Sequence, residues 1–464
     1  MRYFFLYSAV ILAITGCSAP LTQIALPSPQ SPQAASASDR VNFHLTTQPG
    51  LPSSGRWKST PVLVDINKDN RLDLALHPRL EQGARVWLQG ENAWQDISQG
   101  LHMDTSCGGG LEMGDINKDH LLDIAVADHC NSVFVYLGQK DNTWQPAKTT
   151  LQSALANKKA AGPEEANTLS GAEDLALGDI NEDGNLDIVA AASDEGGFTV
   201  FLGDGTGKKW KEMKADGLPS AEDPGADIES HDNQGGWAVD VQLHDINNDK
   251  HLDVVASYFT GPHVWLGDGK GHWQSKATGL KVTSTTGIYR KLAVADMNGD
   301  GLKDIAIANS VNGAEAYYQK ADGTWQDTVD MMPDLKNGAT AIALGDLDGD
   351  GNIDAVIGGS KAAQQDDPSG LYVVLGDGKG QWHYEPGSQL PSQGLEEVWG
   401  LSLADMNGDQ RLDLVAATGS SSDKNKVTVK KHGRKQAVAT PKIQDNKSKL
   451  PHVQIWLNGL SNKK

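Results

Sequence analysis

Short apolar runs recur in pairs along the chain, and each pair flanks one polar stretch. The runs before the polar stretches read PVLVDI, LEMGDI, LALGDI, VQLHDI, LAVADM, IALGDL and LSLADM. Those after them read LDLAL, LDIAVA, LDIVAA, LDVVAS, KDIAIA, IDAVIG and LDLVAA. Runs this short and rich in Val, Ile and Leu predict strands, and consecutive apolar positions predict burial on both faces. Each polar stretch is therefore predicted to be the turn of a β-hairpin.

The polar stretch is a nine-residue sequence that occurs seven times. The copies are DINKDNRLD (65–73), DINKDHLLD (115–123), DINEDGNLD (179–187), DINNDKHLD (245–253), DMNGDGLKD (296–304), DLDGDGNID (346–354) and DMNGDQRLD (405–413). Oxygen-bearing side chains at positions 1, 3, 5 and 9, with the main-chain carbonyl of position 7, suit a hard cation such as Ca²⁺. The repetition predicts up to seven Ca²⁺ sites. The predicted metal-binding residues are Asp65, Asn67, Asp69, Arg71, Asp73, Asp115, Asn117, Asp119, Leu121, Asp123, Asp179, Asn181, Asp183, Asn185, Asp187, Asp245, Asn247, Asp249, His251, Asp253, Asp296, Asn298, Asp300, Leu302, Asp304, Asp346, Asp348, Asp350, Asn352, Asp354, Asp405, Asn407, Asp409, Arg411 and Asp413.

A single copy of this loop has two other interpretations, an EF-hand and a simple Asx-rich turn. An EF-hand needs a bidentate Glu at position 12 and flanking helices. Position 12 here is always apolar, so the EF-hand interpretation fails. Seven copies in one register also disfavour unrelated Asx turns. The residues at position 12 are Leu76, Val126, Ala190, Ala256, Ile307, Ile357 and Ala416.

Each hairpin is followed by a third apolar run and, in six repeats, by a Gly/Asp turn that ends at a tryptophan. These tryptophans are expected to open a fourth strand and to serve packing: Trp94, Trp144, Trp210, Trp273, Trp325 and Trp382. Four antiparallel strands repeated seven times predict an all-β, seven-bladed β-propeller. The last repeat stops after VQIWLNGL (453–460), so residues 41–50 are predicted to supply its outer strand, with Phe43 in the place of the tryptophan.

With these loops and strands, the chain resembles FG-GAP/VCBS-repeat proteins over about residues 41–460. That family includes bacterial relatives of the integrin α-subunit propeller and of some fungal lectins. The resemblance implies a calcium-binding platform for glycan or protein ligands, used in adhesion. The family usually has Gly at position 6 of the loop, and the replacements by His120, Lys250 and Gln410 leave open whether the second, fourth and seventh loops bind Ca²⁺.

The N-terminus predicts export and lipidation. Residues 1–16, MRYFFLYSAVILAITG, are too short to span a bilayer and fit a signal peptide. The following ITGC resembles the lipobox of bacterial lipoproteins, which implies a lipidated Cys17, a membrane anchor and an outer-membrane protein on the periplasmic side or at the cell surface. An ordinary signal peptide with a chance cysteine is the alternative. Residues 17–40 read as a flexible tether, 41–460 as the propeller and 461–464 as a tail.

Charge and cysteine content refine this picture. With 60 Asp+Glu against 40 Lys+Arg, the net charge of −20 argues against nucleic acid as a partner. Residues 421–450 are a basic insertion in the last blade, read either as a solvated loop or as a contact for an acidic polymer. In the second hairpin, Cys107 and Cys130 should face each other at the end away from the Ca²⁺ loop, so a disulfide is predicted.

The face opposite the Ca²⁺ loops is the predicted ligand face. It holds the longer connections 99–109, 147–171, 215–237, 358–370 and 389–399. Trp57, Trp237, Tyr289 and Trp399 enter this face and are either ligand-binding or caps on the blade interfaces.

No catalytic residue is predicted, because GxSxG, HExxH, CxxC and phosphate-loop motifs are absent from the sequence. A site built from His77, His102 and His129 on the same face is the enzymatic alternative. The other functions left open are a polysaccharide lyase or hydrolase and a structural subunit of an envelope complex.

Overall fold

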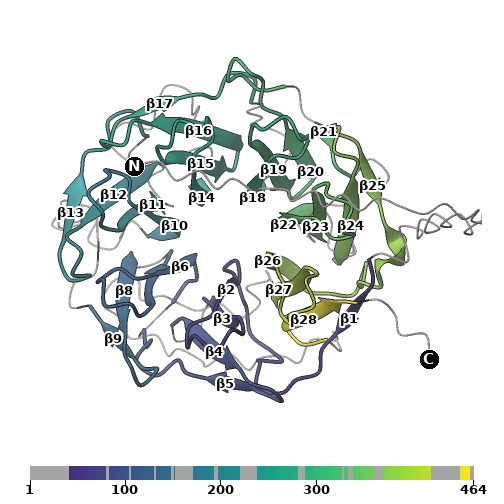
Figure 1. Cartoon of the computed structure of the whole chain (residues 1–464), viewed down its shortest axis with the longest axis horizontal. Helices are drawn as coiled ribbons and strands as arrows, with labels where there is room; N and C mark the ends of the chain where they lie inside the picture. The colour runs from purple at the N-terminus through teal and green to yellow at the C-terminus, as the bar shows by residue number, and fades with distance from the viewer. Residues whose placement is uncertain are drawn as a thin grey trace, which may run out of the picture. The chain divides into compact units, whose positions relative to one another are not determined.

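Seven four-stranded antiparallel sheets, called blades here, surround a common axis in the computed structural model of the chain (Figure 1). The structure describes residues 41–79, 83–103, 106–129, 132–147, 151, 171–192, 197–219, 238–280, 288–326, 329–332, 338–359, 369–419 and 450–459. All of them lie in one compact unit of the chain. Apart from the short 3₁₀ turn η1 (Pro386–Ser388), the regular elements of these residues are strands. The predicted all-β propeller is confirmed.

The first six blades follow the order of the sequence, and the first strand of each lies nearest the axis in Figure 1. Their strands are β2 (Val62–Val64), β3 (Asp73–Leu76), β4 (Arg85–Gln89), β5 (Trp94–Asp96); β6 (Leu111–Gly114), β7 (Asp123–Ala127), β8 (Val133–Gly138), β9 (Trp144–Pro146); β10 (Ala172–Gly178), β11 (Asp187–Ala192), β12 (Phe198–Gly203), β13 (Trp210–Met213); β14 (Ala238–His244), β15 (Asp253–Tyr258), β16 (Gly261–Gly267), β17 (Trp273–Ser275); β18 (Tyr289–Ala295), β19 (Asp304–Asn309), β20 (Gly313–Tyr317), β21 (Val329–Asp330); and β22 (Ala339–Gly345), β23 (Asp354–Gly359), β24 (Leu371–Gly376), β25 (Trp382–Tyr384).

The seventh blade closes the ring with strands from both ends of the propeller. It consists of β26 (Glu397–Ala404), β27 (Asp413–Gly419), β28 (Val453–Asn458) and β1 (Phe43–Leu45). β1 pairs antiparallel with β28, with Phe43 opposite Asn458. This is the predicted closure, although the paired strand spans three residues of the predicted 41–50. Closure of this kind leaves few strand edges open to other chains.

The hydrophobic core is divided among the seven interfaces between neighbouring blades. One buried cluster fills each interface, and together the clusters include the middle strands of every blade. Between the first two blades, for example, Val86 packs with Ile124 and Trp144. Because both faces of each middle strand meet a neighbouring blade, these strands are apolar at consecutive positions, as the sequence predicted.

The repeated tryptophans join each blade to the one before it. The backbone N–H of Trp144 donates to the carbonyl of Gln99 (2.9 Å), and the indole N–H donates to the carbonyl of Ile97 (2.9 Å). Gly100 follows with φ +103°, and a Cβ there would lie 1.8 Å from the carbonyl oxygen of Trp144. Gly50, Gly217 and Gly279 meet the tryptophans of other blades in the same way. These tryptophans therefore serve packing between blades.

The fifth blade departs from the expected pattern at its outer strand. Trp325 forms only an isolated bridge with Gln319, and the outer strand β21 begins four residues later, at Val329. The other five tryptophans each begin an outer strand, as predicted. Trp325 keeps its packing role, because its backbone N–H donates to Thr278 of the preceding blade (3.0 Å).

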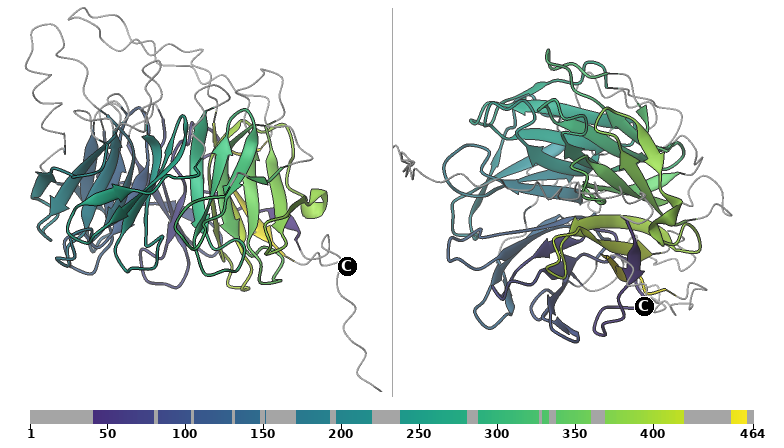
Figure 2. Two further views of the ribbon diagram at one scale, coloured as in Figure 1. Left: turned by 90° about the horizontal axis from the view of Figure 1, so that it is seen from above. Right: turned by 45° about the vertical axis from the view of Figure 1, so that its right-hand side comes forward.

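The blades form a disc whose two faces carry different connections, as the side view in Figure 2 shows. The nine-residue loops join the first strand of each blade to the second, so they gather on one face. The second strands end, and the third strands and the first strands of the next blades begin, at the opposite end of the sheets. No helix in the described part of the chain is long and apolar enough to cross a membrane.

Candidate functional site

The seven nine-residue loops share one network of hydrogen bonds. In the first loop, the carboxylate of Asp65 accepts from the backbone N–H of Asp69 (3.0 Å) and of Asn70 (2.8 Å). The carboxylate of Asp69 accepts from the backbone N–H of Arg71 (2.9 Å). Equivalent bonds occur at positions 1, 5, 6 and 7 of the other six loops. The repeated side chains therefore fold each loop around the carboxylate of position 1.

Positions 4 and 6 of every loop have a left-handed backbone. At position 6, His120 (φ 69°), Lys250 (φ 78°) and Gln410 (φ 67°) adopt the conformation that Gly301 and Gly351 adopt without strain. The sequence predicted this requirement at position 6 but not at position 4. The left-handed residues at position 4 are Lys68, Lys118, Glu182, Asn248, Gly299, Gly349 and Gly408. Each residue other than Gly in this region costs about 1–2 kcal/mol.

The Asp at position 9 is buried in every loop and links three strands. Asp304, fully buried, accepts from the backbone N–H of Met297 in its own loop and of Gln319 after the third strand, both at 2.9 Å. Burial, with the nearby charges of Asp300 and Asp296, raises the pKa of Asp304 to about 7. The corresponding carboxyls of Asp123 and Asp413 have a pKa of about 6 for the same reason. A cation in the loop would favour the charged form of this carboxyl.

The sixth loop brings carboxylate oxygens closest to a cation-binding arrangement. One oxygen from each of Asp346, Asp348 and Asp354 lies within 4.8 Å of the others. Carboxylates held this close repel one another, and hard oxygen donors on a tight loop are the ligands that Ca²⁺ prefers. The residues present in the sixth loop therefore fit a Ca²⁺ ion.

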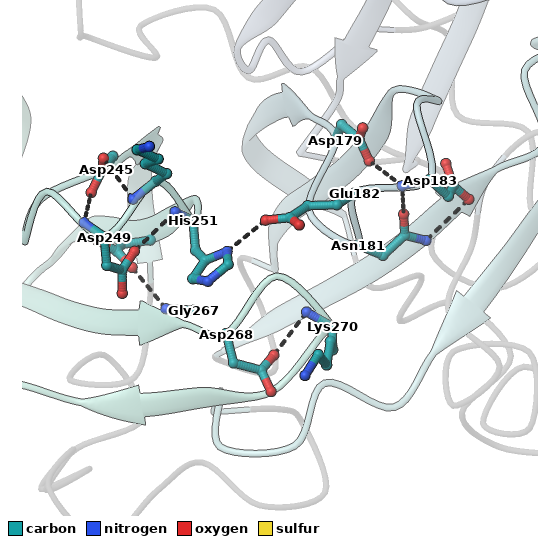
Figure 3. Close-up of polar contacts among 12 residues, drawn as sticks. Asp179, Asn181, Glu182, Asp183, Asp245, Asp249, His251, Gly267, Asp268 and Lys270 are labelled. Carbon is teal, nitrogen blue, oxygen red and sulfur yellow. Dashed lines mark hydrogen bonds and ion pairs between the residues drawn. The ribbon is translucent and has the colours of Figure 1, made fainter.

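Neighbouring loops also touch one another through the residue at position 4. Figure 3 shows His251 of the fourth loop, whose Nδ1 lies 2.5 Å from Oε1 of Glu182 in the third loop. This hydrogen bond is the main reason why the pKa of His251 is raised. Lys68 donates to the carbonyl of His120 in the second loop, and Asn248 donates to that of Gly301 in the fifth. The loops are thus coupled around part of the face.

A second candidate site lies on the axis, at the end of the inner strands away from these loops. Five inner strands are irregular here, with one or two extra residues that interrupt the pairing to the next strand. Such bulges turn a side chain away from its regular direction. A cavity of about 20 Å³ lies among these residues, which is room for about one water molecule or a group of that size. Its lining residues are Lys58, Gly109, Glu173, Val239, Arg290, Lys291, Thr340 and Trp399.

The charged groups around this cavity form two clusters that join several blades. In one, Glu173 contacts Nζ of Lys58 and lies 2.9 Å from Nδ1 of His129. In the other, Nζ of Lys291 lies 2.7 Å from Asp174 and 2.6 Å from Asp240. Because Lys291, Asp174 and Asp240 come from three different blades, the second cluster ties those blades together at the axis.

The buried residues Ser106, His77 and Asp128 are of the three types found in the catalytic triad of a serine hydrolase, but their hydrogen bonds connect them differently. Oγ of Ser106 lies 2.9 Å from Nε2 of His77 and donates to Asp128 (3.0 Å). The serine thus sits between the two other groups, whereas a nucleophilic serine needs the histidine between itself and the carboxylate. Burial lowers the pKa of His77 to about 4. All three side chains are at most 4 % exposed, so the arrangement serves packing.

The predicted aromatic residues of the ligand face have different positions. Trp57 (2 % exposed) packs edge-on against Trp87, and Tyr289 (1 % exposed) donates to Glu315 (3.0 Å). Both side chains are therefore buried within the blades. Trp399 is half-buried and lines the axial cavity.

Four other predicted features lie partly or wholly outside the described residues. Cys107 is disulfide-bonded. Backbone bonds from His129 to Gly108 and from Ala127 to Gly110 continue the hairpin register toward it. Its predicted partner, Cys130, is not described. Also outside the described residues are Cys17, Trp237 and the insertion 421–450 up to residue 449.

The axial cavity is the feature that sequence reasoning missed. Its charged residues lie next to strands, where periodicity predicts no special role, and Asp174 and Lys291 are 117 positions apart. One signal was available: polar residues such as Glu173 and Arg290 stand at the start of inner strands that are otherwise apolar.

Comparison with known families supports the repeats directly. The FG-GAP-like repeat family matches residues 115–190, 245–307 and 296–357, which include the second to sixth loops. These parts of the chain are therefore similar to FG-GAP-like repeats. A search of curated protein sequences finds no match.

Solved structures with a similar fold have little sequence identity to this chain. BBS1N, solved in complex with ARL6DN, has a TM-score of 0.50 and 10 % identity, over 82 % of this chain and 94 % of that one. An Agrocybe aegerita lectin that recognises non-reducing terminal N-acetylglucosamine has a TM-score of 0.46 and 19 % identity, over 73 % and 84 %. YCF48 from Cyanidioschyzon merolae has a TM-score of 0.47 and 15 % identity, over 81 % and 97 %. At these values, only the likeness to BBS1N bears on the argument, and it concerns the fold alone.

Proposed function

Because parts of the chain are similar to FG-GAP-like repeats and the fold is a seven-bladed propeller, we propose that it is a calcium-stabilised binding module of the bacterial cell envelope, without catalytic activity. In this proposal the Ca²⁺ ions stiffen the hairpins on one face, and a glycan or protein ligand binds the opposite face. The observation that carries the calcium part is the sixth loop, where carboxylate oxygens of Asp346, Asp348 and Asp354 lie within 4.8 Å of one another.

Calcium would act on stability through the position-9 residues. Each of these buried carboxylates holds its own loop and the end of the third strand, as Asp354 does for Leu347 and Gly376, both at 2.9 Å. A bound Ca²⁺ would neutralise the charge that burial disfavours. At free Ca²⁺ ten times Kd, each site would contribute about 1.4 kcal/mol to the free energy of unfolding.

Thermal unfolding of the purified mature protein tests the calcium proposal. We expect the melting temperature to rise with free Ca²⁺ in the range of about 0.1–1 mM, which is typical of extracellular calcium modules, and EGTA to reverse the rise. Magnesium at the same concentration is the control, because its strict octahedral geometry suits these loops poorly. An unchanged melting temperature in Ca²⁺ would contradict the proposal.

The envelope location is supported by the resemblance of ITGC, which ends at Cys17, to a lipobox. If Cys17 carries lipid, the wild-type protein enters the detergent phase on Triton X-114 partitioning, and Cys17→Ser moves it to the aqueous phase. The control is Ser18→Ala, which changes the neighbouring residue but keeps Cys17. A substitution of Cys107 is unsuitable as a control, because it would remove a disulfide of the fold. Equal partitioning of wild type and Cys17→Ser would refute the anchor.

The binding role is tested on a glycan array and by crosslinking on intact cells, each with product analysis. We expect retention of a ligand without cleavage, with the retention weakened by EGTA. Release of shortened or unsaturated saccharides would instead assign a hydrolase or lyase activity and overturn the non-catalytic part.

A further inference from the structure

The axial cavity receives a contribution from every blade. Glu173, Val239, Thr340 and Trp399 are the bulge residues of the third, fourth, sixth and seventh blades, and the fifth contributes Arg290 and Lys291. Lys58 and Gly109 precede the inner strands of the first and second blades. The position on the axis therefore depends on the closed ring and on no single repeat.

Arg290 is the cation with the fewest polar contacts in this cavity. Its guanidinium carbon lies 5.6 Å from the ring centre of Trp399 and 5.4 Å from that of Phe259, so two aromatic side chains contact the group. Its Nε is buried, and in the structure this nitrogen donates no hydrogen bond. A guanidinium held this way keeps donors for an added acceptor.

The charges around Arg290 leave cations in excess. Lys58 and Arg79 are close enough to interact with it, and the carboxylates that attract this group of cations are those of Glu173 and Glu397. Three cations thus meet two carboxylates around Arg290, whereas in the second cluster Lys291 meets the two carboxylates of Asp174 and Asp240. Burial lowers the pKa of Lys58 and of Arg290, and mutual repulsion with Arg79 lowers both further.

We propose that the axial cavity binds the carboxylate group of a small organic anion, with Arg290 and Lys58 as its cationic contacts and Trp399 beside the rest of the ligand. This inference rests on the proposed binding function and names the ligand class. The cavity of about 20 Å³ has room for about one group of the size of a water molecule, so only the carboxylate end of the ligand enters it. The two oxygens of a carboxylate also match the planar donor geometry of a guanidinium, and the opposite charges strengthen the hydrogen bonds. A neutral amide lacks this charge.

Saturation-transfer NMR with acetate and acetamide tests the site on the calcium-loaded mature protein. The two probes have nearly the same shape and differ in charge. We expect a saturable signal from acetate at least five-fold above that from acetamide. Arg290→Gln should reduce the acetate signal at least five-fold, whereas Arg85→Gln should not change it, because Arg85 pairs with Asp96 on the outer strands of the first blade. Equal signals from the two probes, or no effect of Arg290→Gln, would overturn the proposal.

A second test puts a carboxylate into the cavity as a side chain of the protein and compares it with an uncharged side chain. Val239 lines the cavity and is 6 % exposed, so Val239→Glu should supply an internal carboxylate and Val239→Gln an uncharged side chain of equal size. We expect Val239→Glu to melt at a higher temperature than Val239→Gln and to lose the acetate signal. The reverse order of melting temperatures would overturn the proposal even where Arg290→Gln fails to fold.

These results are separable from the calcium and envelope proposals. Calcium-dependent melting is measured on the same samples. If acetate fails to bind while Ca²⁺ still stabilises the protein, only the axial site is refuted. If acetate binds but Ca²⁺ has no effect on melting, the axial site stands and the calcium proposal falls.

Discussion

Replacing Asp348 by Asn should have opposite effects on stability with and without calcium. At positions 1, 3, 5 and 9, the sixth loop carries four Asp residues where each of the other loops carries three Asp and one Asn. In the absence of Ca²⁺ these charges repel one another, so removing one should stabilise the fold. In the presence of Ca²⁺ the same change removes a charged ligand, so the loop should bind the ion more weakly.

The size of the effect follows from the spacing of the carboxylates. At 4.8 Å, the largest separation among the oxygens of Asp346, Asp348 and Asp354, two unit charges repel by about 0.9 kcal/mol in water and about 3.5 kcal/mol at an effective dielectric constant of 20. Because Asp348 is only half-buried, we take about 1 kcal/mol for its repulsion with each of Asp346 and Asp354. For a chain of this size, about 1 °C of melting temperature corresponds to 1 kcal/mol, which gives a rise of about 2 °C.

The assay is thermal unfolding followed by circular dichroism at pH 8, once in EGTA and once in millimolar Ca²⁺. At this pH Asp354, whose pKa burial and the charge of Asp348 raise to about 7, is mostly ionised. The matched variant is Asn298→Asp in the fifth loop, which also has Gly at positions 4 and 6 and should show the opposite changes. If Asp348→Asn lowers the melting temperature in EGTA, or Asn298→Asp raises it, the charge argument is refuted.

Three further changes test the fold and the loops by thermal unfolding. Gly100→Ala should destabilise the protein by several kcal/mol, because its Cβ would lie 1.8 Å from the carbonyl oxygen of Trp144; a variant as stable as wild type would exclude this close contact. Deletion of residues 41–50 should lower the melting temperature by many degrees, since it removes the outer strand of the seventh blade, and an unchanged value would contradict the ring closure. In EGTA, lowering the pH from 8 to 5.5 should raise the melting temperature, because the folded pKa of about 6 for Asp123 and about 7 for Asp304 exceeds the ordinary 3.8. Between those values the folded state binds more protons than the unfolded state, and a fall in melting temperature over this range would reverse the sign of the argument.

The ring itself was predictable because its signals are local and repeated. A hairpin turn needs its own Asp residues and left-handed positions, and the sequence repeats them seven times with strands on both sides. Even the closure had a local signal, since Phe43 stands where the other blades have Trp, and it is 1 % exposed in the seventh-blade core.

The axial cluster was not predictable because no local pattern encodes it. Lys291 meets Asp174 and Asp240 only when three separate blades stand around one axis. The left-handed residues at position 4 were missed for a related reason. Lys68 and Glu182 reach the next loop, so the backbone strain at these positions is compensated by contacts outside their own repeat.

The pairing of β1 with β28 has a consequence for the order of events during synthesis. Phe43 is made 415 residues before its partner Asn458. The strand β1 therefore stays unpaired until β28 has been made, and the ring closes only when these two strands pair. Until its own first strand pairs, the open edge of β28 in one molecule can accept the first strand of another, so a high concentration of folding chains would favour exchanged dimers.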